Sequence, residues 1–67
     1  MTYTTRQLFA DTEAAIVEGR EEDAVSLLAR NPKTDDPKTQ GHWTFAAAAY
    51  DAGDDEGALL QLRSVEW

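Results

Sequence analysis

Hydrophobic residues in the first third of the chain recur with the spacing of an α-helix. One face of this helix would carry Leu8, Phe9, Thr12, Ala15 and Ile16. Thr4, with Gln7 three residues later, is typical of a helix N-terminus at which each side chain satisfies a backbone N–H. Gly19 can adopt the left-handed conformation that commonly ends a helix. The pattern therefore predicts a first helix over about residues 5–18.

A second helical segment begins just after this glycine. Its first turn carries Glu21, Glu22 and Asp23, where carboxylates interact favourably with the helix dipole. Its inward face would consist of Ala24, Leu27 and Leu28. The segment would end near Arg30, because the sequence NPKTDDPK that follows is polar and contains two prolines.

Two further helices are predicted in the second half of the chain. Asp36 before Pro37 is typical of an N-cap followed by the first helical position. A third helix would therefore begin there, or a few residues later, after Gly41. Gly53 would end it. A fourth helix would open with Asp54, Asp55 and Glu56 and turn Ala58, Leu59, Leu62 and Val65 inward. No run of alternating β-branched residues predicts a strand. We therefore expect an all-α chain of four short helices.

The two predicted hairpins can be aligned with each other without a gap. The segment AAIVEGREEDAVSLL (14–28) then pairs with the segment AAYDAGDDEGALLQL (48–62). Identical pairs are Ala14/Ala48, Ala15/Ala49, Gly19/Gly53, Glu22/Glu56, Ala24/Ala58 and Leu28/Leu62. The same alignment pairs Phe9 with Trp43. A period of about 34 residues, which is the interval between these pairs, is typical of one class of helical repeat.

Each half resembles a tetratricopeptide repeat in its inter-helix glycine, in the alanine five residues on and in the leucine four residues further. The small residues Thr12 and Ala46 also fit the close helix contact of that family. Two features depart from the family pattern. His42 stands where the family has tryptophan, and Trp43 comes one position later. Pro32 only approximates the proline that usually ends the second helix, and the second copy has no such proline. The resemblance implies helix-turn-helix units that stack into a protein-binding scaffold. Another small helical bundle is the alternative.

On this basis the chain is one helical domain, residues 1–67, built as two stacked antiparallel hairpins. Repeat one covers about residues 5–31, a linker covers 32–36, and repeat two covers about 37–67. Two stacked repeats leave apolar ends uncovered, because such arrays usually have three or more repeats or dedicated caps. We therefore expect a homodimer or a permanent complex with another protein.

Composition removes several classes of function. The 67 residues include no cysteine and one histidine, His42, so disulfides, thiolate sites and His-rich metal sites are not expected, and no cofactor is predicted. No apolar run reaches the roughly 18 to 20 residues that span a bilayer, and the N-terminus lacks a signal-peptide pattern, so we expect a cytoplasmic protein. The formal net charge of −7 disfavours nucleic acid and anionic membranes and favours a basic protein partner.

The two acidic runs are the most distinctive charged feature. They comprise Glu21, Glu22, Asp23, Asp54, Asp55 and Glu56, and Asp51 lies close by in sequence. The structural explanation is stabilisation of helix N-termini through caps and the dipole. The functional hypothesis is that equivalent turns of stacked hairpins lie side by side and form one acidic edge for a Lys/Arg-rich partner.

Catalysis by these carboxylates is not expected. Paired acids act as general acid and base when burial raises the pKa of one of them, and no apolar residues flank these turns closely. The sequence DAGDDEG also lacks the ligand spacing of a calcium loop. We therefore expect a protein that is not an enzyme and holds no metal.

Two aromatic residues are further candidates for protein contact. Trp43 and Tyr50 are seven positions apart and share a helix face, whereas Phe45 lies roughly 200° around the helix from Trp43. Phe45 is therefore either covered by a neighbouring hairpin or exposed. Trp67 ends the chain, and aromatic residues at the edges of small proteins commonly lie in interfaces.

These observations favour a non-enzymatic interaction module that binds a protein partner through an acidic and aromatic surface. The alternative is a small acidic inhibitor of the phage type, which blocks a nucleic-acid-binding protein by presenting carboxylates where phosphates would lie. A third hypothesis is that the acidity serves solubility alone and that the partner site is apolar. A clamp for peptide carboxylates is not expected, because Arg6 stands nearly alone as a base on the predicted first helices.

Overall fold

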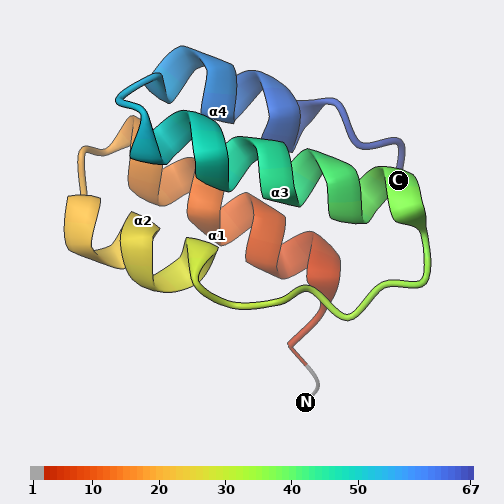
Figure 1. Cartoon of the computed structure of the whole chain (residues 1–67). Coiled ribbons are helices and arrows are strands. Elements are labelled where there is room, and N and C mark those ends of the chain that lie inside the picture. Colours follow the sequence, from red (N-terminus) through yellow and green to blue (C-terminus); the bar gives the residue numbers. More distant parts are fainter. Residues whose placement is uncertain (1–2) are drawn as a thin grey trace.

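The computed structural model describes residues 3–67 and contains four α-helices in this range (Figure 1). They are α1 (Thr5–Val17), α2 (Glu21–Leu28), α3 (Pro37–Asp51) and α4 (Asp55–Arg63). The all-α prediction is confirmed. The first two residues of the predicted 1–67 domain lie outside the described range.

Helix α1 begins at the predicted N-cap and ends at the predicted glycine, although within residues 3–67 only the Thr4 half of the expected reciprocal cap forms. The Thr4 hydroxyl accepts a hydrogen bond from the backbone N–H of Gln7 at 3.1 Å. At the other end Gly19 has a positive φ of 73°, and the N–H of Arg20 donates to the carbonyl of Ala15 at 2.9 Å. This is the Schellman pattern, which satisfies carbonyl groups that a helix end otherwise leaves without a partner.

The turn between α3 and α4 repeats the Schellman hydrogen bonds of the turn between α1 and α2. Gly53 has a φ of 83°, and the N–H of Asp54 donates to the carbonyl of Ala49 at 2.8 Å. These atoms are the equivalents of the Arg20 and Ala15 atoms in the alignment that pairs Gly19 with Gly53. The internal repeat seen in the sequence is therefore also a repeat of backbone geometry.

The two turns lie at the same end of the molecule (Figure 1). Within each hairpin the helices run antiparallel, α1 against α2 and α3 against α4, and the hairpins meet through contacts of α1 with α4 and of α2 with α3. The C-termini of α1 and α3 and the N-termini of α2 and α4 consequently gather at one end of the molecule. The linker, the start of α1 and the C-terminus lie toward the other end (Figure 1).

The core combines a few large side chains with several alanines. Its buried hydrophobic residues are Leu8, Phe9, Ala15, Ile16, Ala24, Trp43, Ala46, Ala58 and Leu62. The ring of Phe9 lies between two indoles, with centroids 4.9 Å from Trp43 and 5.3 Å from Trp67. The four alanines are fully buried, and side chains this small allow neighbouring helices to approach closely.

The buried polar groups of the core are hydrogen-bonded. The indole N–H of Trp43 donates to the backbone carbonyl of Arg30 at 2.8 Å, which joins α3 to the segment after α2. The hydroxyl of Thr12, fully buried, donates to the carbonyl of Leu8 at 2.7 Å. Among residues 3–67 no buried side-chain nitrogen or oxygen lacks a partner. Such groups are costly to bury without one.

The predicted helix boundaries differ from the structure mainly at C-termini. The second helix ends at Leu28 instead of near Arg30, with Ala29 as its C-cap. The spacing predicts Val65 on the inward side of the fourth helix, but α4 ends at Arg63. The hydroxyl of Ser64 donates to the carbonyl of Leu60, which satisfies a carbonyl of the last turn. Val65 still packs on the core, from the tail.

The left-handed glycines give a testable prediction. Gly19→Ala should lower stability by roughly 1 to 2 kcal/mol, because a Cβ is strained at positive φ. Gly41→Ala is the matched control: it lies inside α3, its added Cβ meets no atom within 4 Å, and it should raise stability by roughly 0.5 to 1 kcal/mol. Urea denaturation followed by circular dichroism measures both. Shifts of the same sign would contradict this account of the turn.

Candidate protein-interaction surface

The charge imbalance of the chain lies where the two turns meet. We call this region, residues 17–23 and 51–57, the acidic end. It holds eight acidic residues, namely Glu18, Glu21, Glu22, Asp23, Asp51, Asp54, Asp55 and Glu56, and one basic residue, Arg20. The remainder of the chain carries five acidic and five basic residues. The acidic end therefore accounts for the whole formal charge of −7, and the remainder is formally neutral.

The carboxylates of the acidic end have different local roles. Asp54 caps α4 by accepting the N–H of Gly57 at 2.9 Å. A Cβ at Gly57 would collide with this capping carboxylate. The N-cap of α2 is Arg20, which makes no side-chain cap. Hydrogen-bonded capping therefore explains Asp54 alone. In the run that opens α2, Asp23 pairs with Arg20, and Glu21 and Glu22 interact with the dipole at the start of the helix.

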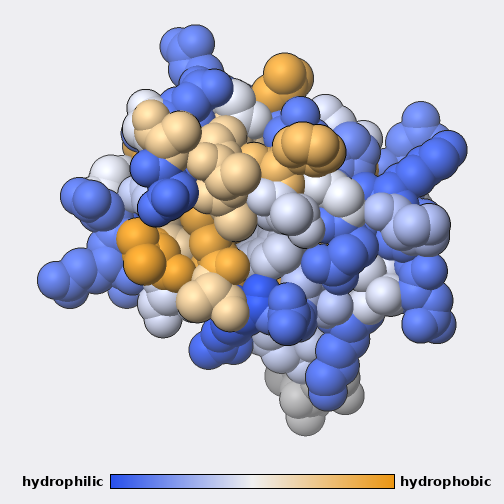
Figure 2. Space-filling model, viewed as in Figure 1, coloured by the Kyte–Doolittle hydropathy of each residue, from blue (hydrophilic) through white to orange (hydrophobic). Residues whose placement is uncertain are grey.

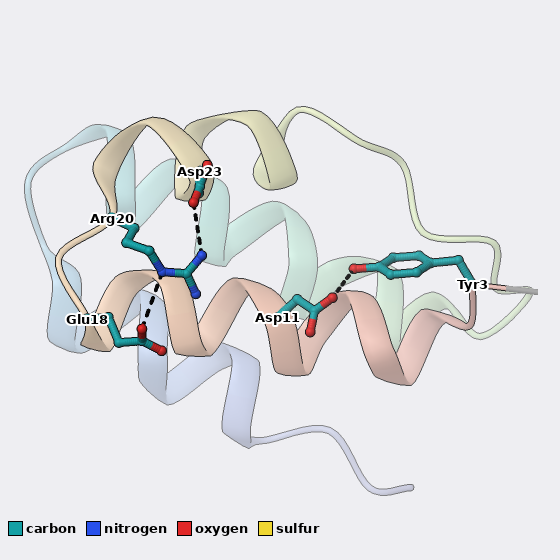
Figure 3. A network of polar contacts seen from close by, with 5 residues as sticks. All are labelled: Tyr3, Asp11, Glu18, Arg20 and Asp23. Atoms are coloured by element: carbon teal, nitrogen blue, oxygen red, sulfur yellow. Dashed lines mark hydrogen bonds and ion pairs between the residues drawn. The ribbon is translucent and has the colours of Figure 1, made fainter.

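Arg20 pairs with two carboxylates of its own turn (Figure 3). Its Nη1 lies 2.9 Å from the Asp23 carboxylate and its Nε lies 3.4 Å from Glu18. The hydrogen bond to Asp23, followed by the charge of Glu18, raises the pKa of the Arg20 guanidinium. All three side chains are exposed, so water screens these pairs. Within residues 3–67 the other carboxylates of the acidic end form no ion pair.

Tyr50 lies near carboxylates from both acidic turns. It lies near the end of α3 and is half-buried. Its partial burial, and then the negative charges of Glu21 and Asp55, raise the pKa of its hydroxyl. One carboxylate comes from α2 and the other from α4. Both turns therefore contribute a carboxylate to the surroundings of this hydroxyl.

An apolar groove runs between α2 and α3 and reaches the acidic end. It is shallow and open to solvent, with a volume of about 390 Å³, and is lined by Val25, Leu28, Ala29, Ala47, Ala48, Tyr50 and Asp51. Figure 2 shows apolar side chains gathered on the face that Figure 1 turns toward the viewer, with hydrophilic side chains around them. Sequence reasoning placed Asp51 at the surface but missed the groove. Its one sequence signal is Val25, an apolar residue outside the inward face of α2.

The two candidate aromatic residues lie apart from each other. Phe45 is 66% exposed and lies on α3, three positions before Ala48 and therefore on the same helix face as the groove wall. Trp67 is 55% exposed, and its ring also packs edge-on against Phe9. It lies at the end of the molecule away from the turns (Figure 1). Phe45 thus shares a helix face with one groove residue without lining the groove itself, whereas Trp67 has a structural contact of its own.

Polar contacts away from the acidic end are structural. The hydroxyl of Tyr3 donates to Asp11 (Figure 3), which raises the pKa of the Tyr3 hydroxyl. The guanidinium of Arg30 lies 5.7 Å from the centre of the Tyr3 ring. These contacts hold the segment before α1 against the body of the protein and the residues that follow α2.

The remaining titratable candidates also stabilise helices. His42 Nδ1 lies 2.9 Å from the Gln61 side-chain oxygen, which ties α3 to α4. Asp36 caps α3, and its hydrogen bonds with the Thr39 hydroxyl and the Lys38 N–H lower the pKa of its carboxyl group. Across residues 3–67 no cluster of three or more His, Cys, Asp or Glu residues has metal-binding geometry. In the same range no helix is long and apolar enough to cross a bilayer.

Comparison with known proteins gave no match to a family model, a curated protein or a solved structure.

Proposed function

We propose that this protein is a non-enzymatic interaction module whose acidic end binds a basic surface of a protein partner. The observation that carries the proposal is the segregation of charge: eight exposed carboxylates at one end, and a formally neutral remainder. A tetratricopeptide-like stacking of the two hairpins belongs to the same proposal. It is supported by the repeated turn and by Ala24 and Ala58, which are both fully buried.

The charge distribution favours an oriented encounter. Unpaired surface charges act over a distance of about 10 Å at ordinary ionic strength. The protein extends 28 Å along its longest axis, so a partner approaching the neutral end experiences little of the field of the acidic end. A basic partner is therefore attracted to the end that carries the two turns.

Charge-neutral variants test this proposal once a partner has been captured and purified. Asp54→Asn/Asp55→Asn/Glu56→Gln should weaken binding by about tenfold and reduce its dependence on salt, because it removes three charges of the acidic end. Asparagine also caps helices well, so α4 should keep its N-terminus. The matched control, Asp35→Asn/Asp36→Asn/Glu66→Gln, removes three carboxylates elsewhere. Equal losses from both triple variants, measured by calorimetry across a salt series, would overturn the proposal.

A second candidate function is inhibition by nucleic-acid mimicry. It is favoured by the same eight carboxylates, which are all exposed and project from two adjacent turns. A mimic would bind a DNA- or RNA-binding protein and would compete with its nucleic acid. Competition with a duplex oligonucleotide distinguishes this function from binding to any other basic partner.

A further inference from the structure

We propose that the groove between α2 and α3 binds an amphipathic helix of the partner, with the basic end of that helix against the acidic end. This inference rests on the proposed function and names the element of the partner that is recognised. It assigns the apolar surface a role that charge alone does not explain.

The walls of the groove are more apolar than their position at the surface requires. Val25 lines the groove from α2 and is 54% exposed, and Leu28 lines it from the same helix and is half-buried. Phe45 on α3 is 66% exposed; it does not line the groove but shares a helix face with Ala48, which does. Single exposed apolar residues are ordinary in proteins, but a contiguous patch with a polar rim is typical of an interaction site.

The floor of the groove suits a helix. Ala47 and Ala48 line it with methyl groups, so another helix backbone can approach α3 closely. Packed helices lie about 8 to 10 Å apart, and small residues allow the shorter distances. Helix α2 has eight residues, and at 1.5 Å per residue it presents a wall of about 12 Å, which is two turns of a bound helix. Apolar side chains at positions i, i+3, i+4 and i+7 would fill such a groove.

Charge complementarity selects the partner. Asp51 lines the groove where it meets the acidic end. Glu21 and Asp55 lie near enough to Tyr50, another residue of the groove, for their negative charges to raise the pKa of its hydroxyl. A bound helix would therefore meet apolar walls along its length and carboxylates at one end, which fits lysine or arginine in its terminal turn. A second copy fits less well, because a two-fold pair joined through this groove places both Asp51 carboxylates in one interface.

Three labelled peptides of the same composition test the inference by fluorescence anisotropy. The first has leucines along one helix face and three lysines in its last turn. The second has the leucines distributed around the helix. The third has the lysines spread along its length. We expect the first to bind at least about tenfold more tightly than either of the others, because only it matches both the walls and the charged end.

Two exposed apolar residues provide the matched variants. Val25→Ser should weaken binding of the first peptide by about tenfold, because it removes an apolar wall. Leu60→Ser is the control, since Leu60 is 63% exposed on α4, lies outside the acidic end and does not line the groove. Ala48→Leu provides a second variant, which fills the groove with an exposed side chain and should reduce binding without disturbing the core.

The outcomes separate this inference from the proposed function. If neutralisation of Asp54, Asp55 and Glu56 weakens binding while Val25→Ser and Ala48→Leu do not, the acidic end binds basic partners and the groove inference is wrong. Equal binding of the three peptides would also overturn it. A concentration-dependent dimer without peptide that Val25→Ser abolishes would assign the groove to a second copy instead. Loss of peptide binding in the two groove variants alone supports the inference.

Discussion

Phe9→Ala should unfold the protein or leave it barely folded. The Phe9 ring is 2% exposed and contacts both Trp43 and Trp67. Removing a buried phenylalanine ring typically costs about 3 to 5 kcal/mol, because its contacts are lost and a cavity remains. A domain of 67 residues has a total stability of roughly 3 to 10 kcal/mol at ordinary values per residue. One substitution therefore removes a large share of that stability.

The matched control for this prediction is Phe45→Ala, the same substitution at an exposed position. Phe45 is 66% exposed, so its removal should change stability by less than about 0.5 kcal/mol. Phe9→Leu keeps part of the ring volume and gives a measurable transition if Phe9→Ala is unfolded. Urea denaturation followed by far-ultraviolet circular dichroism compares all three with the parent. Similar losses at Phe9 and Phe45 would show that the core does not centre on Phe9.

Trp43→Ala should produce the second large effect. The Trp43 side chain is 3% exposed, and it both packs on Phe9 and donates its indole N–H to the carbonyl of Arg30. We expect a loss of about 3 to 5 kcal/mol for the side-chain volume. Trp43→Phe retains an aromatic ring but not the donor, so it measures the loss of the hydrogen bond together with the smaller loss of volume.

The control for Trp43 is Trp67→Ala at the C-terminus. Trp67 is 55% exposed and has one edge-on contact with Phe9, which is worth about 0.5 to 1.5 kcal/mol beyond its area burial. Its removal should therefore cost much less than that of Trp43. The free energies of unfolding from urea titrations give the comparison. A loss at Trp67 as large as that at Trp43 would mean that the C-terminal tail is an essential wall of the core.

The sequence predicted the helices well because their termini depend on local chemistry. Asp36 with Pro37, and Gly19 and Gly53, act within a few residues of their own positions, and the structure confirms all of them. The C-terminus of α4 was less predictable, because the apolar Val65 continues the helical spacing even though the helix ends before it. Periodicity reports which face is apolar and does not report whether the backbone remains helical.

The candidate interaction surface could be predicted only in part. The repeat placed the two acidic turns together, because equivalent positions in packed hairpins have equivalent neighbours. The groove was not predicted, since Val25 and Ala48 are ordinary as single exposed residues and only the packing of α2 against α3 brings them together. The contact of α1 with α4 was also beyond the sequence pattern, because an apolar face does not specify its partner helix.

The fully buried alanines also affect how relatives of this chain can be recognised. Ala15, Ala24, Ala46 and Ala58 have no exposed surface, so larger side chains there would separate the helices. Alanine and glycine are among the commonest residues in proteins, and their coincidence in two sequences carries little weight in an alignment. A homologue could therefore differ at most surface positions and keep this fold. A search should require a glycine, an alanine five positions on and a leucine four further, occurring twice at the interval that separates the two turn glycines.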